Sequence, residues 1–216
     1  MIPGMSFLGG PAFRLALAAT MLLSGCEQAA RLTEQATRST GLTGTVPASA
    51  PQLVGPERLR VSIPSTEAQA TLGPVARRGD VTVWQTLDGI TLSFRGGSLI
   101  ATRGLGDDLM SADVAGRLEM LRQARTADQS GYYPHIRSYL DGEDRTVFRG
   151  YQCRQVARTQ TGAGRDGTLR RIEELCVSPT DRFTNLYWLT AEGAMVRSRQ
   201  WISPTIQYME TSRVPR

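Results

Sequence analysis

The chain has 216 residues, of which 40% are hydrophobic and 21% charged, as is ordinary for a soluble globular domain. This composition excludes a polytopic membrane protein and a wholly disordered chain. All 25 basic residues are arginine, against 20 acidic residues, and there is one histidine. A single histidine excludes a multi-histidine metal site, and the lack of lysine excludes Schiff-base chemistry. We therefore expect a protein that is not an enzyme and that uses no metal or cofactor.

The arginine bias has two interpretations, and the sequence leaves both open. GC-rich codon usage favours arginine over lysine without any function. Alternatively, the planar guanidinium recognises carboxylates and phosphates better than an ammonium does. The arginines occur singly or in short pairs, such as Arg77-Arg78 and Arg170-Arg171, and form no basic block. We therefore expect no nucleic-acid partner.

Residues 1–25 have the pattern of a lipoprotein signal peptide. Arg14 precedes an apolar run over residues 15–23, which is too short to span a bilayer and has the length of a signal-peptide core. The run ends in Leu23-Ser24-Gly25-Cys26, which resembles the lipobox of bacterial lipoproteins. The resemblance implies that Cys26 carries acyl chains, palmitate among them, and becomes the mature N-terminus. Ordinary secretory cleavage nearby would instead leave a free thiol.

The residues after Cys26 indicate where the protein is held. In Gram-negative lipoproteins an aspartate directly after the acylated cysteine commonly signals retention at the inner membrane, whereas here the residue is Glu27. We therefore expect a lipid anchor in the outer membrane, facing the periplasm. Residues 26–57 are rich in Ala, Thr, Ser, Gln and Pro and predict a lipidated N-terminus with a flexible tether. Residues 58–216 predict a single β-rich periplasmic domain.

Alternation of apolar and polar residues with period two dominates the predicted domain. Residues 108–125 are the exception, because apolar side chains recur there at helical spacing behind Asp107 and Asp108. Residues 126–145 predict a loop. The predicted fold class is mainly β, an antiparallel sheet sandwich or open half-barrel with one or two short helices. The segments expected to form strands are residues 59–63, 81–87, 90–94, 99–100, 147–159, 168–177, 185–190, 195–202 and 205–212.

The dipeptide Asp88-Gly89 lies between two of these segments and is typical of a two-residue hairpin turn. Such a turn pairs Leu87 with Ile90 and places Trp84 among threonine and serine side chains, opposite the apolar face. On that polar face the Trp84 ring could stack on a sugar. Alternatively, a second sheet or loop covers the face and makes Trp84 part of the core.

Cys153 and Cys176 remain once Cys26 is acylated, and an even pair in an oxidising periplasm indicates a disulfide. The turn candidate at residues 162–167 lies midway between them, so a simple hairpin sets the two cysteines opposite each other. A redox-active pair and two free thiols are the alternatives, although no Cys-x-x-Cys spacing is present.

A turn at residues 192–193 would pair Trp188 with Arg197. One face of this hairpin would then present Trp188, Arg197, Arg199 and Trp201. Arginines beside tryptophans suit an anionic glycan or a protein partner. Equally, the face could form a layer between sheets, with its buried arginines paired to the aspartates at positions 107 and 108.

His135 falls in the predicted loop, where no serine or cysteine partner is identifiable, so we expect it to be structural and not a general base. The adjacent residues Asp107 and Asp108 could mimic the catalytic carboxylate pair of a glycosidase. At the start of a helix, however, aspartates commonly cap backbone N–H groups. We therefore predict no catalytic residue.

Several segments together resemble the YjbF-type (GfcB-type) lipoproteins of the group 4 capsule polysaccharide family. They are LSGC at residues 23–26, VTVWQTLDGITLSFRGGSLIATRGLGDDL at 81–109 and NLYWLTAEGAMVRSRQWISP at 185–204. The resemblance spans most of residues 58–212. This family is found in operons for exopolysaccharide or capsule secretion, alongside outer-membrane partners. The resemblance implies an all-β fold and supplies no established catalytic residue.

The resulting hypothesis is a non-enzymatic outer-membrane lipoprotein that assists secretion or assembly of an extracellular or capsular polysaccharide. It would bind an anionic polymer or dock on an outer-membrane polysaccharide-export protein. The alternative is a half-barrel that carries a lipid or a lipoprotein, which requires an apolar concave cavity. A glycan-modifying enzyme is the third hypothesis and requires two close carboxylates in a cleft.

Overall fold

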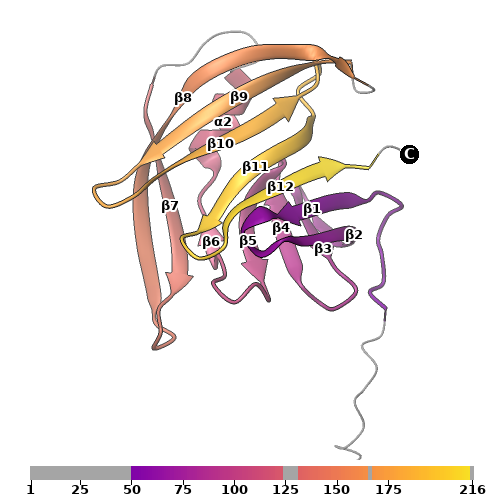
Figure 1. Ribbon diagram of the computed structural model, residues 1–216, viewed down its shortest axis with the longest axis vertical. Coiled ribbons are helices and arrows are strands. Elements are labelled where there is room, and N and C mark those ends of the chain that lie inside the picture. The colour runs from indigo at the N-terminus through magenta and orange to yellow at the C-terminus, as the bar shows by residue number, and fades with distance from the viewer. Residues whose placement is uncertain (1–49, 124–130, 165–166, 215–216) are drawn as a thin grey trace, which may run out of the picture. The chain divides into compact units, whose positions relative to one another are not determined.

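The computed structural model describes residues 50–123, 131–164 and 167–214. Their strands form one antiparallel sheet (Figure 1), which confirms the mainly β prediction. The strands are β1 (Leu59–Ile63), β2 (Ala68–Arg78), β3 (Val81–Gln85), β4 (Thr91–Arg95), β5 (Ser98–Arg103), β6 (Ser111–Ala112), β7 (Tyr133–Leu140), β8 (Thr146–Gly164), β9 (Gly167–Val177), β10 (Arg182–Leu189), β11 (Met195–Ser203) and β12 (Gln207–Arg213). The helices in these ranges are the 3-10 helix η1 (Pro64–Thr66) and the α-helix α2 (Ala115–Gln123). Neither helix has the length and hydrophobicity needed to cross a bilayer.

The strand order in the sheet is β5-β4-β3-β2-β1-β12-β11-β10-β9-β8-β7-β6. The described chain begins in the middle of the sheet at β1, runs outward to β5, crosses to β6 at the other edge and returns to β12 beside β1. The two edges approach each other, since the Thr102 amide of β5 donates to the Leu109 carbonyl at 2.9 Å. The Met110 amide in turn donates to the Ser138 carbonyl of β7 at 2.9 Å. The sheet is therefore barrel-like and nearly closed.

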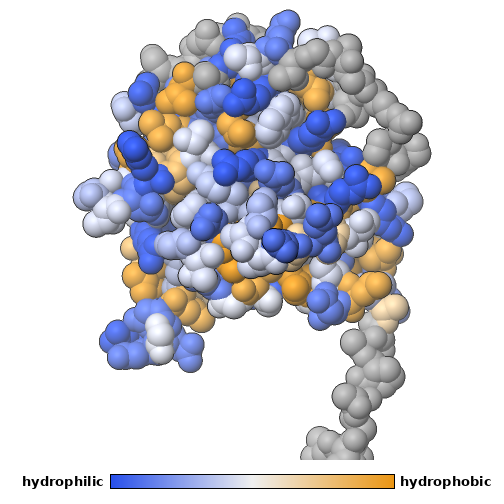
Figure 2. Space-filling view, in the orientation of Figure 1, coloured by the Kyte–Doolittle hydropathy of each residue, from blue (hydrophilic) through white to orange (hydrophobic). Residues whose placement is uncertain are grey.

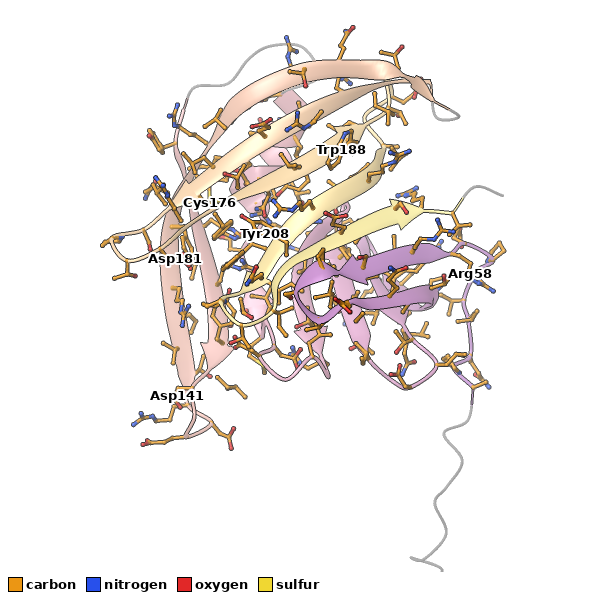
Figure 3. The ribbon with its side chains drawn as sticks, viewed as in Figure 1. Arg58, Asp141, Cys176, Asp181, Trp188 and Tyr208 are labelled. Carbon is orange, nitrogen blue, oxygen red and sulfur yellow. A yellow bond between two sulfur atoms is a disulfide. The ribbon has the colours of Figure 1, made fainter. Side chains whose placement is uncertain are left out.

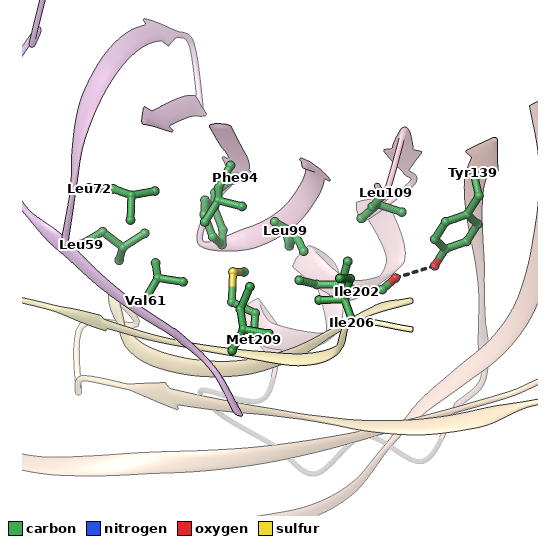
Figure 4. Close-up of a cluster of buried hydrophobic side chains, with 12 residues drawn as sticks. Leu59, Val61, Leu72, Phe94, Leu99, Leu109, Tyr139, Ile202, Ile206 and Met209 are labelled. Carbon is green, nitrogen blue, oxygen red and sulfur yellow. Dashed lines mark hydrogen bonds between the residues drawn. The ribbon is translucent and has the colours of Figure 1, made fainter. Parts of the chain in front are cut away.

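The inner face of this sheet holds the main hydrophobic core (Figure 4). Its largest cluster consists of Leu59, Val61, Ile63, Leu72, Leu92, Phe94, Leu99, Leu109, Tyr139, Ile202, Ile206 and Met209. β1 contributes every second residue, as the period of a strand with one buried face requires. Full burial of an aliphatic or aromatic side chain stabilises the fold by about 1.5–3 kcal/mol. The Tyr139 hydroxyl donates to the Ile202 carbonyl at 2.7 Å, so its polar end is also satisfied.

The side chain of Gln200 crosses the interior from β11 to β5. Its Oε1 accepts from the Leu99 amide at 2.8 Å, and its Nε2 donates to the Gly97 carbonyl at 2.9 Å. Gly97 has a φ of +86°, and a Cβ there would lie 2.8 Å from the sulfur of Met195. Glycine is therefore required where β5 comes against the opposite side of the sheet.

The β3–β4 hairpin differs from the prediction by one residue in register. Trp84 pairs with Leu92, because the loop between the strands has three residues, 87–89. The Thr86 amide donates to the Ile90 carbonyl at 3.0 Å and closes this loop. A shift of one residue exchanges the two faces of a strand. Trp84 consequently lies on the core side with Leu92, whereas Leu87 is 78% exposed.

Two other predictions are also corrected. The helix α2 begins at Ala115, whose amide donates to Asp113 Oδ1 at 2.9 Å, and part of the expected helix forms β6 instead. Residues 124–130, which include the end of the expected helix, lie outside the described residues. β7 occupies residues 133–140 of the predicted loop. Its inward positions include the polar residues His135 and Arg137, so the alternation in hydropathy that identifies a strand is missing.

β8 and β9 pair in the predicted register, which places Cys153 directly opposite Cys176. Their sulfur atoms are bonded at 2.01 Å, and both residues are fully buried. The turn candidate includes residues 165–166, which lie outside the described residues. The disulfide joins the interior of β8 to the end of β9 and closes a sequence separation of 23 residues.

Replacement of both cysteines, Cys153→Ser with Cys176→Ser, should lower the free energy of unfolding by about 3 kcal/mol, because the crosslink restricts a loop of this length in the unfolded chain. Urea titrations of the oxidised wild type and the double variant measure the difference. Reductant should shift the wild-type midpoint toward that of the variant and leave the variant unchanged. Coincident midpoints for the oxidised wild type and the variant would contradict the prediction.

Candidate functional site

A basic hollow lies in the outer face of the sheet, over β10, β11, β12 and β1. We call it the Trp188 hollow. Its volume is about 580 Å³, and the charged and aromatic residues that line it are Arg60, Trp188, Arg197, Arg199, Glu210 and Arg213. Figure 2 shows this face of the molecule, where hydrophilic side chains predominate over the middle of the sheet, and Figure 3 labels Trp188 on β10.

The strand register brings these side chains together in two rows. Trp188 lies opposite Arg197, as the turn at residues 192–193 predicts, and Arg197 lies opposite Ser212, which in turn faces Arg60. The neighbouring row runs through Leu186, Arg199, Glu210 and Ser62. Residues directly opposite in antiparallel strands point to the same face. Four strands therefore contribute one continuous polar surface.

Arg199 is held in place by two neighbours, Tyr208 and Glu210, of which Glu210 also lines the hollow. Its guanidinium carbon lies 3.5 Å from the centre of the Tyr208 ring, and its Nε lies 3.8 Å from Glu210 Oε1. The Tyr208 hydroxyl accepts a hydrogen bond from the Thr184 amide at 3.1 Å, which fixes the ring. Arginine thus stacks on an aromatic ring, as expected, but the ring belongs to tyrosine. Such a contact stabilises by about 0.5–1 kcal/mol at an exposed position.

The structure places Trp201 outside the Trp188 hollow. Its ring stacks on Phe183, with 5.8 Å between centroids and 6° between planes, and lies edge-on to Tyr208 at 5.0 Å. These rings belong to a cluster that packs around the buried Cys153–Cys176 disulfide. Trp201 is partly buried against this cluster, so its ring adds apolar contact area beside Phe183 and the disulfide. We therefore assign Trp201 a packing role and not a binding one.

Trp84 lies between the core and the surface. It packs partly buried against the largest hydrophobic cluster, in agreement with the core alternative. It also lines two smaller hollows at the end of the sheet, of about 160 Å³ and 450 Å³. We call these the Trp84 hollows. The indole is therefore fixed on its core side and open on the other.

The Trp188 hollow has an excess of positive charge, since four arginines line it against the one carboxylate of Glu210. Arg199 contacts Glu210 in place of the aspartates that the alternative pairing required. Asp108 instead accepts from Thr102 Oγ1 at 2.6 Å and from the Gly104 amide at 2.8 Å, and so fixes the loop after β5.

Three charged residues of the Trp188 hollow were not identified from the sequence: Arg60, Glu210 and Arg213. Their strands, β1 and β12, come from the two ends of the described domain. Alternation does place Arg60 on the face opposite Leu59 and Val61, so its outward position was available from the sequence. Its proximity to Arg197 required knowledge that β1 pairs with β12.

A second polar cluster is buried inside the sheet, beneath α2. The carboxylate of Glu174, which is 0% exposed, accepts from Arg117 Nε at 2.9 Å, Asn185 Nδ2 at 2.7 Å and the Tyr187 hydroxyl at 2.8 Å. The Tyr133 hydroxyl is a further donor. Burial opposes ionisation, but attraction by Arg117 and these hydrogen bonds outweigh it and lower the pKa of Glu174 to about 2. The cluster is thus a satisfied ion pair that attaches the helix to the sheet.

His135 is part of the same interior and has both ring nitrogens engaged. Its Nδ1 lies 2.6 Å from the Asp113 carbonyl, and its Nε2 lies 3.2 Å from a guanidinium nitrogen of Arg117. An Nδ1–H that donates to the carbonyl leaves Nε2 to accept from Arg117. Burial, with repulsion from Arg117 and Arg137, lowers the pKa of His135 to about 3. The neutral ring is a structural bridge, in agreement with the expected role.

Within the described ranges, metal-ligand atoms come close together at Cys153, Glu174 and Cys176, whose candidate atoms lie within 4.8 Å of one another. The two sulfurs are bonded to each other, and the carboxylate is taken by its hydrogen-bond donors. In the oxidised protein this group therefore offers no thiolate ligands.

The low pKa of His135 makes a pH dependence testable. As pH falls below about 6.5 the unfolded chain binds a proton that the folded chain does not take up until near pH 3, so stability declines through this window. Between about pH 6.5 and 5, above the range of most carboxylates, we expect a slope of roughly 1 kcal/mol per pH unit. His135 is the only histidine, so His135→Gln should flatten this slope. Urea midpoints across this range measure it; parallel profiles for the two proteins would contradict the assignment.

Comparisons with known proteins agree with this architecture. The crystal structure of the hypothetical lipoprotein YmcC from Escherichia coli K12 shares the fold, with a TM-score of 0.57 and 14% identity over 76% of this chain and 88% of that one. An exported protein with a YmcC-like fold from Bacteroides fragilis NCTC 9343 aligns over 77% of this chain and 97% of its own at 8% identity, and its TM-score of 0.29 is too low to support an argument. No curated protein sequence matches the chain.

The sequence also matches a family model, that of the group 4 capsule polysaccharide lipoproteins GfcB and YjbF, over residues 52–214. This range includes all twelve strands and both helices of the described structure. The fold, the paired cysteines and the Trp188 hairpin thus lie within the matched region. The protein belongs to the YjbF family of group 4 capsule polysaccharide lipoproteins.

Proposed function

We propose that this protein is a non-enzymatic lipoprotein, anchored through Cys26 in the outer membrane and facing the periplasm, that assists secretion or assembly of a capsular or extracellular polysaccharide. The proposed activity is binding of an acidic polysaccharide in the Trp188 hollow. The observation that carries it is the grouping of Trp188 with four arginines on one outer face. Family membership supplies the polysaccharide context.

The chemistry of the hollow fits a uronic-acid polymer. Guanidinium groups form directional, bidentate hydrogen bonds with carboxylates, and the apolar side of a sugar ring packs on the flat face of an indole. The arginines come from three neighbouring strands, so a bound chain would contact a rigid sheet and not a flexible loop. Such a preformed surface lowers the entropy cost of binding.

The lipid-carrier alternative is less well supported. Its requirement is an apolar internal cavity, and the apolar hollow lined by Val61, Leu72, Ile90 and Leu105 has a volume of about 150 Å³. Ligand pockets commonly reach about 300–1,000 Å³. Docking on an outer-membrane export protein is compatible with polymer binding, and the charged Trp188 hollow favours the polymer as the first ligand to test.

Replacement of Trp188 by alanine or Arg197 by serine should weaken binding of polygalacturonate by roughly tenfold, about 1.4 kcal/mol, through loss of the stacking platform or of a carboxylate partner. Titration calorimetry with the purified periplasmic domain provides the measurement. Added salt should weaken wild-type binding, because exposed charges are screened. Neutral dextran should bind weakly or not at all.

Arg182→Ser is the matched control, because Arg182 is an exposed arginine at the other end of β10, about 20 Å along the strand from Trp188. This variant should bind as the wild type does. If Arg182→Ser and Arg197→Ser lower the affinity equally, the loss follows from the change in net charge alone, which would contradict a specific site. Failure of the wild type to bind any acidic polysaccharide would overturn the proposal.

The anchor is tested separately, since Cys26 lies outside the described residues. Cys26→Ser should abolish incorporation of labelled palmitate and move the protein from the outer-membrane fraction to the soluble periplasmic fraction, because several acyl chains provide the membrane affinity. Surface polysaccharide should also decrease in cells that carry only this variant. Retention of Cys26→Ser in the membrane fraction would argue against the lipid anchor.

A further inference from the structure

We infer that the Trp188 hollow is one end of a longer tract that passes over the rim of the sheet to Trp84 and holds several consecutive sugars of an acidic polysaccharide. This inference rests on the proposed function and specifies its ligand as an extended chain in place of a single sugar. It makes two tryptophans, on different faces and from distant parts of the sequence, into platforms of one site.

The three hollows share their lining residues. Arg197 and Arg213 line both the Trp188 hollow and the 160 Å³ Trp84 hollow. Arg213 also lines the 450 Å³ Trp84 hollow, together with Trp84 and Arg58. The same guanidinium groups therefore stand at the boundary between neighbouring hollows. Figure 3 labels Trp188 and Arg58, which mark the two ends of this tract.

The strand order gives an upper bound on the length of the tract. From β10, which carries Trp188, to β3, which carries Trp84, the sheet order passes through β11, β12, β1 and β2. These five strand spacings correspond to about 24 Å along the sheet. A direct path over the rim is shorter than this, because Arg197, which lies opposite Trp188, lines a hollow together with Trp84. A chain of several sugars is needed to reach from the Trp188 hollow into both Trp84 hollows.

The tract carries an excess of positive charge. Six arginines line its three hollows: Arg58, Arg60, Arg77, Arg197, Arg199 and Arg213. The carboxylates in the same linings are three and each has an arginine neighbour, at 2.8 Å for Glu57 with Arg77, 3.4 Å for Asp80 with Arg95 and 3.8 Å for Glu210 with Arg199. Arginines thus exceed carboxylates by three, which suits a ligand with repeated negative charges.

Trp84 is suited to the second platform by its partial exposure. Its partner Leu92 and the nearby Phe94 are buried, whereas all five residues of β3 are half-buried. One side of the indole packs on the core cluster, which fixes its orientation, and the other side faces the Trp84 hollows. The exposed side of the indole is therefore available to a sugar ring.

The test compares two galacturonic-acid probes, a trisaccharide and a dodecasaccharide, on the full periplasmic domain. A dodecasaccharide offers roughly ten overlapping trisaccharide frames, so about tenfold tighter binding is statistical. We expect roughly a hundredfold difference, because contacts at the second platform add to those at the first. A dodecasaccharide that binds only about tenfold more tightly than the trisaccharide would overturn the extended tract.

A charge-reversal pair locates the second platform. Arg77→Glu should weaken dodecasaccharide binding by roughly tenfold and leave trisaccharide binding unchanged, since Arg77 lines only the larger Trp84 hollow. Arg78→Glu makes the same charge change at the next exposed residue of β2, which lines none of the three hollows, and should have little effect. Trp84→Ala, checked for folding by circular dichroism, should reproduce the effect of Arg77→Glu.

The outcomes separate the two proposals. Equal losses for Arg77→Glu and Arg78→Glu, with trisaccharide still bound at Trp188, would overturn the tract and retain the Trp188 hollow. Absence of binding for both probes would overturn the proposed function as well. A length-dependent affinity that Arg77→Glu abolishes and Arg78→Glu preserves supports the tract.

Discussion

β1 and β12, the first and last strands of the described domain, pair antiparallel, with Leu59 opposite Arg213 and Ser62 opposite Glu210. This pairing joins the β1–β5 half of the sheet to the β6–β12 half, and the largest core cluster draws side chains from both. The Trp188 hollow depends on it too, because Arg60 and Arg197 meet only across β12. Contacts between the two ends of a domain form late and slowly in folding, because the entropy cost of closing the long loop between them comes before the packing contacts can stabilise it. The Trp188 hollow is therefore completed by the same step that completes the core.

Inside this sheet, the space under α2 is filled by ions as well as hydrocarbons. Arg117 and Glu174 are almost fully excluded from water, and the desolvation of such a pair is offset only when its remaining hydrogen bonds are made. Asn185, Tyr187 and Tyr133 supply them. The helix is thus held in a defined orientation by directional bonds, which an apolar contact of the same area would not provide.

Local patterns in the sequence predicted those parts of the fold that depend on neighbouring segments. The register that opposes Cys153 to Cys176, and Trp188 to Arg197, follows from turn residues midway between strands. The predicted register of the hairpin at Trp84 was wrong. The dipeptide Asp88-Gly89 is typical of a two-residue turn, whereas in the structure Leu87 also belongs to the loop, which therefore has three residues. β7 was missed because its inward side chains are partly polar and have partners distant in sequence. Arg60 and Arg213 could not be assigned to the site without the β1–β12 pairing.

The amide of Gln200 presents a donor and an acceptor side by side, as a peptide group does, and it offers both to the backbone at the start of β5. β5 lies at one edge of the strand order, and its pairing with β4 contains an irregularity between Ser93 and Phe94. A slip of this edge strand by one residue would turn its buried side chains outward. The Gln200 side chain thus bonds to the backbone at the start of β5 as a neighbouring strand would, from inside the barrel-like sheet. One side chain of β11 thereby fixes the register of β5, a strand that is not its neighbour in the sheet, and helps to align the two edges that approach each other.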